Sequence, residues 1–117
     1  TRVIEVNAGA RVTIDNVTIA NGRSPVGESG GGILNLGNTF LRDVTIRDNL
    51  ADQDGGGISS FAGASLDAIR LNVFDNRAMF GGGISSTTNT NTILVDSSIR
   101  NNIATEGGGG IENAELG

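Results

Sequence analysis

Several residue types are missing or rare in this chain, and each absence narrows the choice of fold. None of the 117 residues is Cys, Trp or Tyr, Pro occurs once, and aromatic residues make up 3%. Without Cys there are no disulfides and no zinc fingers. With so few large aromatic side chains, a thick globular core is not expected, and the single Pro distinguishes the chain from a disordered Pro/Gly linker. The fold must therefore be one that uses small and polar residues.

The chain is acidic overall, and two of the three basic residue types are absent from it. There is no Lys and no His, so all eight basic residues are Arg, against thirteen Asp and Glu, for a net charge of −5. This balance repels nucleic acid and anionic membranes. No apolar run approaches the roughly 18 residues of a membrane span. We predict neither a nucleic-acid partner nor membrane insertion. The start at Thr1, without Met or a signal sequence, predicts a processed or excised piece.

What the chain has in abundance is glycine, and it recurs at a fixed period. Gly-Gly-Gly-Ile ends at Ile33, Ile58, Ile84 and Ile111, in steps of 25, 26 and 27 residues. A second marker, Ile/Val-x-x-Asn-x-Ala, recurs in the same phase. Two markers in phase indicate an internal repeat. We predict one domain over 1–117 that is a segment or subunit of a larger solenoid or assembly. Its repeats are expected at about 1–29, 30–54, 55–80, 81–107 and, in part, 108–117.

Each repeat contains short runs of alternating apolar and polar residues. Val12-Thr13-Ile14 and Val44-Thr45-Ile46 are examples, and this period of two is typical of strands. Three such strands with their turns use about 25 residues, which matches one coil of a parallel β-helix. The predicted fold is therefore all-β, a parallel β-helix of about four coils with three short strands each. In the first, degenerate repeat, Val6-Asn7 aligns with Leu34-Asn35.

Stacked coils place equivalent residues in ladders. We expect two further inward columns, Val17/Val44/Leu71/Ser97 and Ile19/Ile46/Val73/Ile99, and a turn ladder of Asn. Asn tolerates left-handed φ, and its side-chain amide can bond to the copies above and below. The main predicted structural ladders are Ile33/Ile58/Ile84/Ile111 (inward), Ala51/Ala78/Ala104 (in a tight corner) and Asn49/Asn76/Asn102.

The two markers together resemble a known group of repeats. Gly-Gly-Gly-Ile followed by Ile-x-x-Asn-x-Ala is similar to the repeats of right-handed parallel β-helix surface proteins, including the polymorphic outer-membrane and autotransporter-like families. The resemblance covers Val3 to Asn113. It implies a right-handed β-helix, and secretion or display on the cell surface as a passenger domain or adhesin. The membrane barrel of those families has no counterpart in this sequence.

Three motifs bear on possible chemistry. The glycine triplets lack the Lys and Ser/Thr of a phosphate loop, so we predict no nucleotide and no cofactor. Asp52-Gln53-Asp54-Gly55 is similar to the start of a calcium loop. The equivalent stretches of other repeats, 77–80 and 104–106, do not repeat this pair of acids, and the GGxGxD repeat of calcium β-rolls is missing. A solvated acidic turn is therefore the preferred interpretation, with Asp52 and Asp54 as weak Ca²⁺ candidates. The pattern Asn16-Val17-Thr18 is a glycosylation sequon.

A polysaccharide-processing or polysaccharide-binding β-helix is the main alternative. A glycoside hydrolase needs two carboxylates, and a lyase combines acids with a basic residue. The best candidate pair is Asp48 and Asp75, but both lie in a column with Asn101, next to the alternating column Asp43/Arg70/Asp96. Surface charge ladders explain these residues without catalysis. We therefore predict no catalytic residues and no enzyme.

An ice-binding solenoid is a lesser alternative. It requires a regular Thr row on every coil, whereas Thr45, Asn72 and Ser98 share one column and the Thr-rich stretch 87–92 occurs in a single coil.

The expected function is a non-catalytic structural or adhesive extracellular β-solenoid. Exposed strand edges at the ends of a solenoid are templates for pairing. Because the chain spans a nearly whole number of coils, head-to-tail stacking would build an open fibre. The expected partners are other copies of the chain or adjoining coils, and, from the resemblance, a host surface or a glycan.

Overall fold

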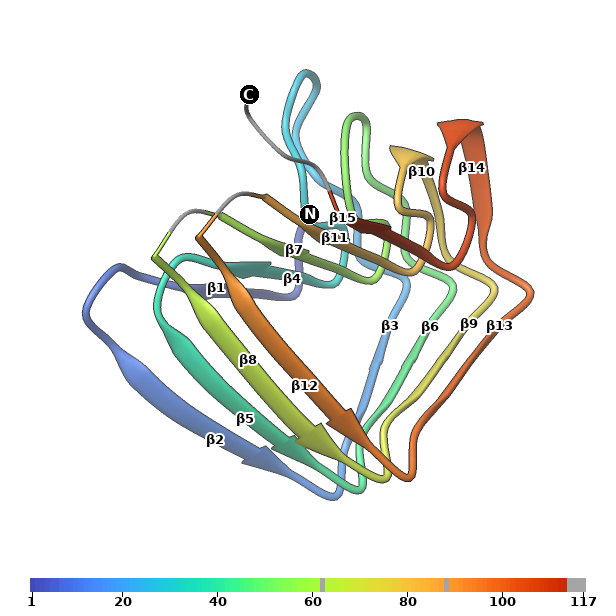
Figure 1. Ribbon diagram of the computed structural model, residues 1–117. Coiled ribbons are helices and arrows are strands. Elements are labelled where there is room, and N and C mark those ends of the chain that lie inside the picture. The colour runs from blue at the N-terminus through green and yellow to red at the C-terminus, as the bar shows by residue number, and fades with distance from the viewer. Residues whose placement is uncertain (62, 88, 114–117) are drawn as a thin grey trace.

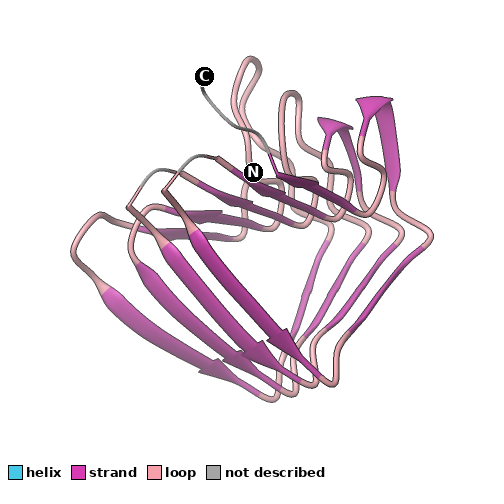
Figure 2. Ribbon diagram, in the orientation of Figure 1, coloured by secondary structure: helices cyan, strands magenta, loops and turns pink. Residues whose placement is uncertain are grey.

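The chain winds into a parallel β-solenoid of about four turns (Figure 1). The computed structural model describes residues 1–61, 63–87 and 89–113, and these contain fifteen strands and no helix (Figure 2). Each turn contributes one strand to each of three sheets, which confirms the predicted fold class. No described segment is a helix long and apolar enough to cross a membrane. Thr88 of the Thr-rich stretch and residues 114–117 of the partial repeat lie outside the described residues.

All strand pairs in the sheets are parallel and connect successive coils. Sheet A has the order β1-β4-β7-β11-β15, sheet B the order β2-β5-β8-β12, and sheet C the order β3-β6-β9-β13. Their bounds are β1 Ile4–Val6, β4 Ile33–Asn35, β7 Ile58–Ser60, β11 Ile84–Ser86 and β15 Ile111–Asn113; β2 Arg11–Asp15, β5 Asn38–Arg42, β8 Ser65–Ile69 and β12 Asn91–Val95; and β3 Thr18–Ala20, β6 Thr45–Arg47, β9 Asn72–Phe74 and β13 Ser98–Arg100. A further pair, β10 (Arg77–Phe80) and β14 (Ile103–Gly107), lies between sheets C and A along the chain.

Inward-facing residues of the three sheets form one core. In sheet A, Ile33, Ile58 and Ile84 pair in register and are fully buried. The sheet C column Ile19/Ile46/Val73/Ile99 also pairs in register. Burial falls toward the ends of the stack, where Ile99 is half-buried, and Val17 and Ile111 are exposed by 45% and 48%. The core is therefore complete in the middle coils, whereas at both ends some inward residues are only half-buried, although Val6 and Ile19 of the first coil remain buried.

The corners turn on residues with left-handed backbone, but not on the residues we expected. The Asn ladder residues Asn49, Asn76 and Asn102 do not adopt positive φ. The residues just before them do: φ is 56° at Asp48, 56° at Asp75 and 53° at Asn101. Asp and Asn tolerate this conformation better than most residues. The prediction of left-handed φ for the ladder Asn was wrong by one position.

The Asn side chains point inward instead and bind successive coils. Asn49 donates from its backbone N and from Nδ2 to Oδ1 of Asn76, each over 3.0 Å, and Asn76 binds Asn102 in the same way. Each Nδ2 also donates to a carbonyl of the preceding coil, Ile19 O in the case of Asn49. The ladder thereby satisfies backbone groups inside a corner that water does not reach.

The Ala ladder, two residues further along, is closed in only two of its three coils. Ala51 and Ala78 are buried, as predicted for a tight corner. Ala104 pairs with Ala78 in register but is only half-buried, so the prediction that Ala104 fills a tight corner was wrong. The reason is its place in the stack, because β14 has a strand partner on one side, β10, and lacks a described partner on the other. Ile111, predicted to be an inward rung, keeps its register with Ile84 but is exposed for the same reason.

The glycine triplets form the corner that enters sheet A. The first glycine has positive φ, 75° at Gly30 and 65° at Gly55. In the first three triplets, the second and third glycines lie directly over the next coil. A Cβ on Gly31 would lie 2.5 Å from Leu50 O and 2.6 Å from Gly56 O. These positions exclude any side chain, because backbones of neighbouring coils meet there.

The first coil differs from the predicted alignment. Ile4 pairs with Ile33, Glu5 with Leu34 and Val6 with Asn35, so the alignment of Val6-Asn7 with Leu34-Asn35 was wrong by one residue. In a strand, a shift of one residue exchanges the two faces. Val6 accordingly fills the inward position that Asn35 fills in the second coil, and both are buried.

Candidate functional site

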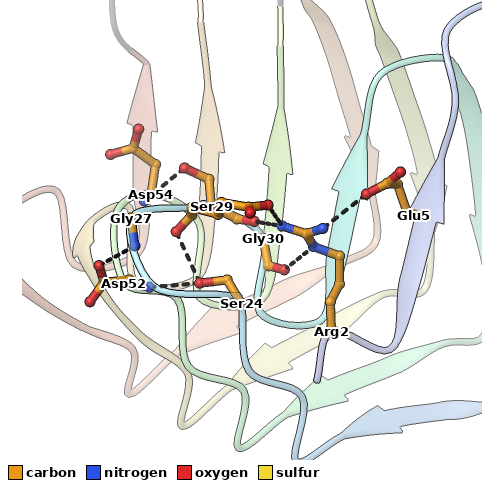
Figure 3. A network of polar contacts seen from close by, with 9 residues as sticks. Arg2, Glu5, Ser24, Gly27, Ser29, Gly30, Asp52 and Asp54 are labelled. Carbon is orange, nitrogen blue, oxygen red and sulfur yellow. Dashed lines mark hydrogen bonds and ion pairs between the residues drawn. The ribbon is translucent and has the colours of Figure 1, made fainter.

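The most connected polar site lies where the loop before β4 meets the loop before β7 (Figure 3). Arg2 lies at its edge, with a side chain that is only 11% exposed. Its guanidinium donates to the carbonyls of Gly30 (3.0 Å) and Ser29 (2.7 Å) and pairs with Glu5 (2.9 Å) and Glu28 (3.1 Å). Arg2 therefore joins the first strand to the glycine corner of the second coil.

Asp52, one of the two Ca²⁺ candidates, is used to hold this loop. Its Oδ2 accepts from Gly27 N over 2.6 Å, and its backbone N donates to Ser24 Oγ over 2.9 Å. Ser24 Oγ in turn donates to Glu28 O over 2.9 Å. These hydrogen bonds tie the turn at Asp52 to the loop that contains Ser24 and Gly27 in the preceding coil.

Asp54, the second candidate, does not join Asp52. Its backbone N donates to Ser29 Oγ over 3.2 Å, while its carboxylate points away from the residues drawn around it (Figure 3). Burial raises the pKa of the Asp54 carboxyl above its ordinary value, and the nearby carboxylate of Glu112 raises this pKa further. In the part of the chain that the structure describes, no three acidic, His or Cys residues come together as metal ligands.

The candidate catalytic pair, Asp48 and Asp75, lies on the outside of a corner. Both are exposed turn residues with φ of 56°, and they follow the paired residues Arg47 and Phe74. Asp48 forms an ion pair with Arg47 over 2.6 Å. Their backbone conformation explains why Asp stands here, independently of any chemistry.

The neighbouring corner carries the expected alternating charges. Arg70 binds Asp43 with two bonds, Nε to Oδ1 over 2.5 Å and a second to Oδ2 over 3.1 Å, and Arg42 binds Asp15 over 2.6 Å. The hydrogen bond from Arg70 lowers the pKa of the Asp43 carboxyl, and the bond from Arg42 lowers that of Asp15. These pairs are exposed, so each contributes little to stability.

The outer face of sheet B carries a hollow that the sequence had not indicated. Its volume is about 360 Å³, and Phe40, 38% exposed, lies at its centre between flanking strands. Arg11, Thr13 and Asp67 project from the same face. The hollow is lined by Arg11, Val12, Thr13, Asn38, Thr39, Phe40, Ser65 and Asp67. The period of two would have revealed Phe40, because buried Thr39 and Leu41 on either side direct it outward.

The outer face of sheet C has the mixed column expected for it. Thr18, Thr45, Asn72 and Ser98 pair in register, so threonine occupies two of the four positions. Further along the same face, the guanidinium carbon of Arg100 lies 4.3 Å from the centre of the Phe74 ring.

Comparisons with known proteins do not add a family to this description. No protein-family model matches the chain, and neither the curated proteins nor the solved structures yield a match. The part of the motif resemblance that is supported is the β-solenoid fold, which the strand pairing shows.

Proposed function

We propose that this protein is a non-catalytic structural or adhesive β-solenoid of the cell exterior, in which copies stack end to end. The observation that carries the proposal is the form of the two ends. Each ends in parallel strand edges, β2 and β3 at one end and β12 and β13 at the other. Half-buried inward residues lie at both, Val12 and Ile14 at the first and Leu94 and Ile99 at the second.

The two ends match strand by strand. If a second copy continues the repeat, β2 lies on β12, so Val12 and Ile14 follow Thr92 and Leu94 in their columns, and Ile19 follows Ile99. Such a contact is heterologous and continues into a fibre. The acidic residues support a structural role, because Asp43 and Asp48 form ion pairs and Asp52 closes a turn.

Sedimentation velocity over a range of protein concentrations, with electron microscopy of the most concentrated sample, tests this proposal. We expect the mass to rise with concentration and linear particles to form. Leu94→Lys, at an open edge, should abolish the rise, because it places a charge in the junction. Ile69→Lys, on the outer face of β8 and away from both ends, is the matched control. Circular dichroism of both variants separates loss of assembly from loss of fold. A mass that stays monomeric at all concentrations would overturn the proposal.

The hollow on sheet B favours a second candidate, binding of a polysaccharide on the outer face. An exposed aromatic ring among polar side chains is a surface on which a sugar ring can stack and accept hydrogen bonds. Phe40 provides the ring, and Arg11, Asn38 and Asp67 provide polar groups. Screening a glycan array with the wild type and Phe40→Ala tests this candidate, with Phe74→Ala on sheet C as the control. Glycan signals that Phe40→Ala leaves unchanged would contradict it.

A further inference from the structure

The end of the stack that carries β12 and β13 has a step. Sheet A has five described strands, whereas sheets B and C have four each. The additional strand, β15, pairs with β11 (Figure 1). Sheet A therefore extends one strand beyond the coil that contains β11, β12 and β13. Beside β15 there is a hollow of about 470 Å³, lined on one side by Ile111 and Asn113 and on the other by Thr92 and Leu94.

β15 is equivalent to β1. Ile4 of β1 pairs with Ile33, and Ile111 of β15 pairs with Ile84, so both strands take the same register on a Gly-Gly-Gly-Ile strand. Their sequences, Ile-Glu-Val and Ile-Glu-Asn, differ at one position. On β11, β15 therefore holds the place that β1 of a second copy would take.

The two strands cannot both be accommodated in a continuous stack. Within one copy, β1 and β2 belong to the same coil, because they pair with β4 and β5 of the next coil. For β2 to pair with β12, β1 must pair with β11. If β1 were added outside β15 instead, β2 would lie one strand spacing, about 4.8 Å, too far from β12.

Exchange of β15 for β1 also improves the burial at this end. Ile111 is 48% exposed, since no described strand of its own coil lies beside it in sheets B and C. Ile4 of a second copy arrives with Val12 and Ile14 from its own coil, and these cover Leu94 at the open edge. Burial of apolar area that β15 alone leaves exposed favours the exchange.

The charges favour the same direction. Glu112 lies with Asp54 around a hollow of about 250 Å³ that Phe80 and Ser85 also line. Among the described ion pairs, none includes Glu112. Glu5, which would replace it, is bound to Arg2 over 2.9 Å. The exchange therefore replaces Glu112, for which no counter-ion is described, by Glu5, a carboxylate that has its own counter-ion, next to the same Asp54.

We propose that β15 occupies, in the single chain, the strand position that β1 of a second copy takes in the assembly, so that stacking requires β15 to be displaced from β11. The inference rests on the proposed end-to-end function. It identifies the partner as the N-terminal coil of a second copy of this chain. It also makes β15 the element that limits how readily copies join.

Two variants of the full chain change the competition in opposite directions. Ile111→Asp weakens β15 on β11 and should lower the concentration of half-assembly by about tenfold, corresponding to about 1.4 kcal/mol. Ile4→Asp weakens the incoming strand and should abolish assembly. Ile69→Asp, on the outer face of β8, should leave the concentration of half-assembly unchanged.

A cross-link tests the displacement directly. Ser86 and Asn113 are register partners on β11 and β15, and neighbouring strands are close enough for a disulfide. The chain has no other Cys. Ser86→Cys/Asn113→Cys should remain monomeric when oxidised and assemble once reduced. The control, Thr45→Cys/Asn72→Cys, joins β6 to β9 within the stack and should assemble in both states.

Sedimentation velocity of these variants separates the two proposals. If the oxidised Ser86→Cys/Asn113→Cys protein assembles as readily as the wild type, end-to-end stacking stands and displacement of β15 is refuted. If every variant, including Ile111→Asp, stays monomeric, the stacking function itself fails, and the inference fails with it. Assembly that only oxidation of the β11–β15 cross-link prevents supports both.

Discussion

At the scale of single residues, the Asn ladder is the most demanding feature of the molecule. Asn76 is 1% exposed, accepts from Asn49 N and Nδ2, and donates to Ile46 O and Asn102 Oδ1. A buried amide with this many partners leaves several unsatisfied groups when it is removed. In the ladder, hydrogen bonds between buried polar side chains hold neighbouring coils together, which in larger proteins is done mainly by apolar packing.

Asn76→Ala should lower the free energy of unfolding by about 2 to 4 kcal/mol, because Asn49 N loses its acceptor and Ile46 O loses the bond from Asn76 Nδ2, both without access to water. Urea unfolding followed by circular dichroism measures the change. Asn72→Ala, on the exposed outer face of β9, is the control and should cost less than about 0.5 kcal/mol. Equal losses for the two variants would show that the ladder contributes no more than a surface amide.

Two carboxylates should respond to pH with opposite signs. The folded state raises the pKa of Asp54 above 3.8, so its charged form destabilises the fold as pH rises from 3.8 through the folded pKa. It lowers the pKa of Asp43 below 3.8, so the stabilisation from Arg70 is present above 3.8 and is lost as pH falls through the folded pKa. At pH 7, Asp54→Asn should therefore raise the melting temperature and Asp43→Asn should lower it slightly. Melting curves from pH 3 to 7 measure both, and a common sign at pH 7 would contradict the assignment.

At the scale of elements, the glycine corner depends on whether another coil follows. Gly57 and Gly110 are both the third glycine of their triplets, and neither has positive φ. A Cβ on Gly57 would lie 2.7 Å from Gly83 O, whereas on Gly110 its nearest neighbour would be Ile99 Cγ2 at 3.5 Å. Gly57→Ala should therefore cost about 1 to 3 kcal/mol, as overpacking does, and Gly110→Ala less than about 0.5 kcal/mol. Urea unfolding of the pair decides this, and a cost at Gly110 as large as at Gly57 would disprove it.

The strands could be predicted from the sequence, but the register of the first coil could not. The alternation in Val44-Thr45-Ile46 and the phase of the two markers predicted three parallel sheets, because ladders require equal spacing. The first coil was misaligned because Thr1-Arg2-Val3 stands where Gly30-Gly31-Gly32 stands in the second coil. Without the glycine marker, nothing in the sequence of the first strand fixes its register on the second coil.

The polar corners were harder to foresee for a different reason. Asp48 and Asn49 are adjacent, and both types tolerate left-handed φ, so composition does not tell which one turns the corner. Burial decides which of the two turns the corner, because the inward residue, Asn49, binds the side-chain amide of Asn76 in the next coil, whereas the outward residue, Asp48, faces water. Two further features depend on the paths of individual loops, which the repeat motif does not predict. These are the contacts of Arg2 with the second coil and the pairing of β10 with β14.

At the scale of the whole molecule, stability should vary along the stack. Each coil contacts only its neighbours, so the stack behaves as a row of similar units whose end units have one neighbour instead of two. The inward residues Leu41 and Leu66 are fully buried in the middle coils, whereas Leu94 and Ile99 at the open end are half-buried. A repeat motif predicts that Ala104 resembles Ala78, but its burial depends on a coil that would follow it. In a monomer, backbone amides of β8 should therefore exchange with solvent more slowly than those of β12.

Assembly should change this gradient at the ends alone. When β2 and β3 of one copy pair with β12 and β13 of another, all four strands gain partners, while β8 keeps those it already has. Hydrogen exchange by mass spectrometry, below and above the assembly concentration, should show increased protection of residues 11–20 and 91–100 and none at 65–69. Residues 111–113 should lose protection under the same conditions, because β15 leaves β11 as β1 takes its place. Protection that rises on the outer face of sheet B instead would indicate lateral contacts and would contradict end-to-end stacking.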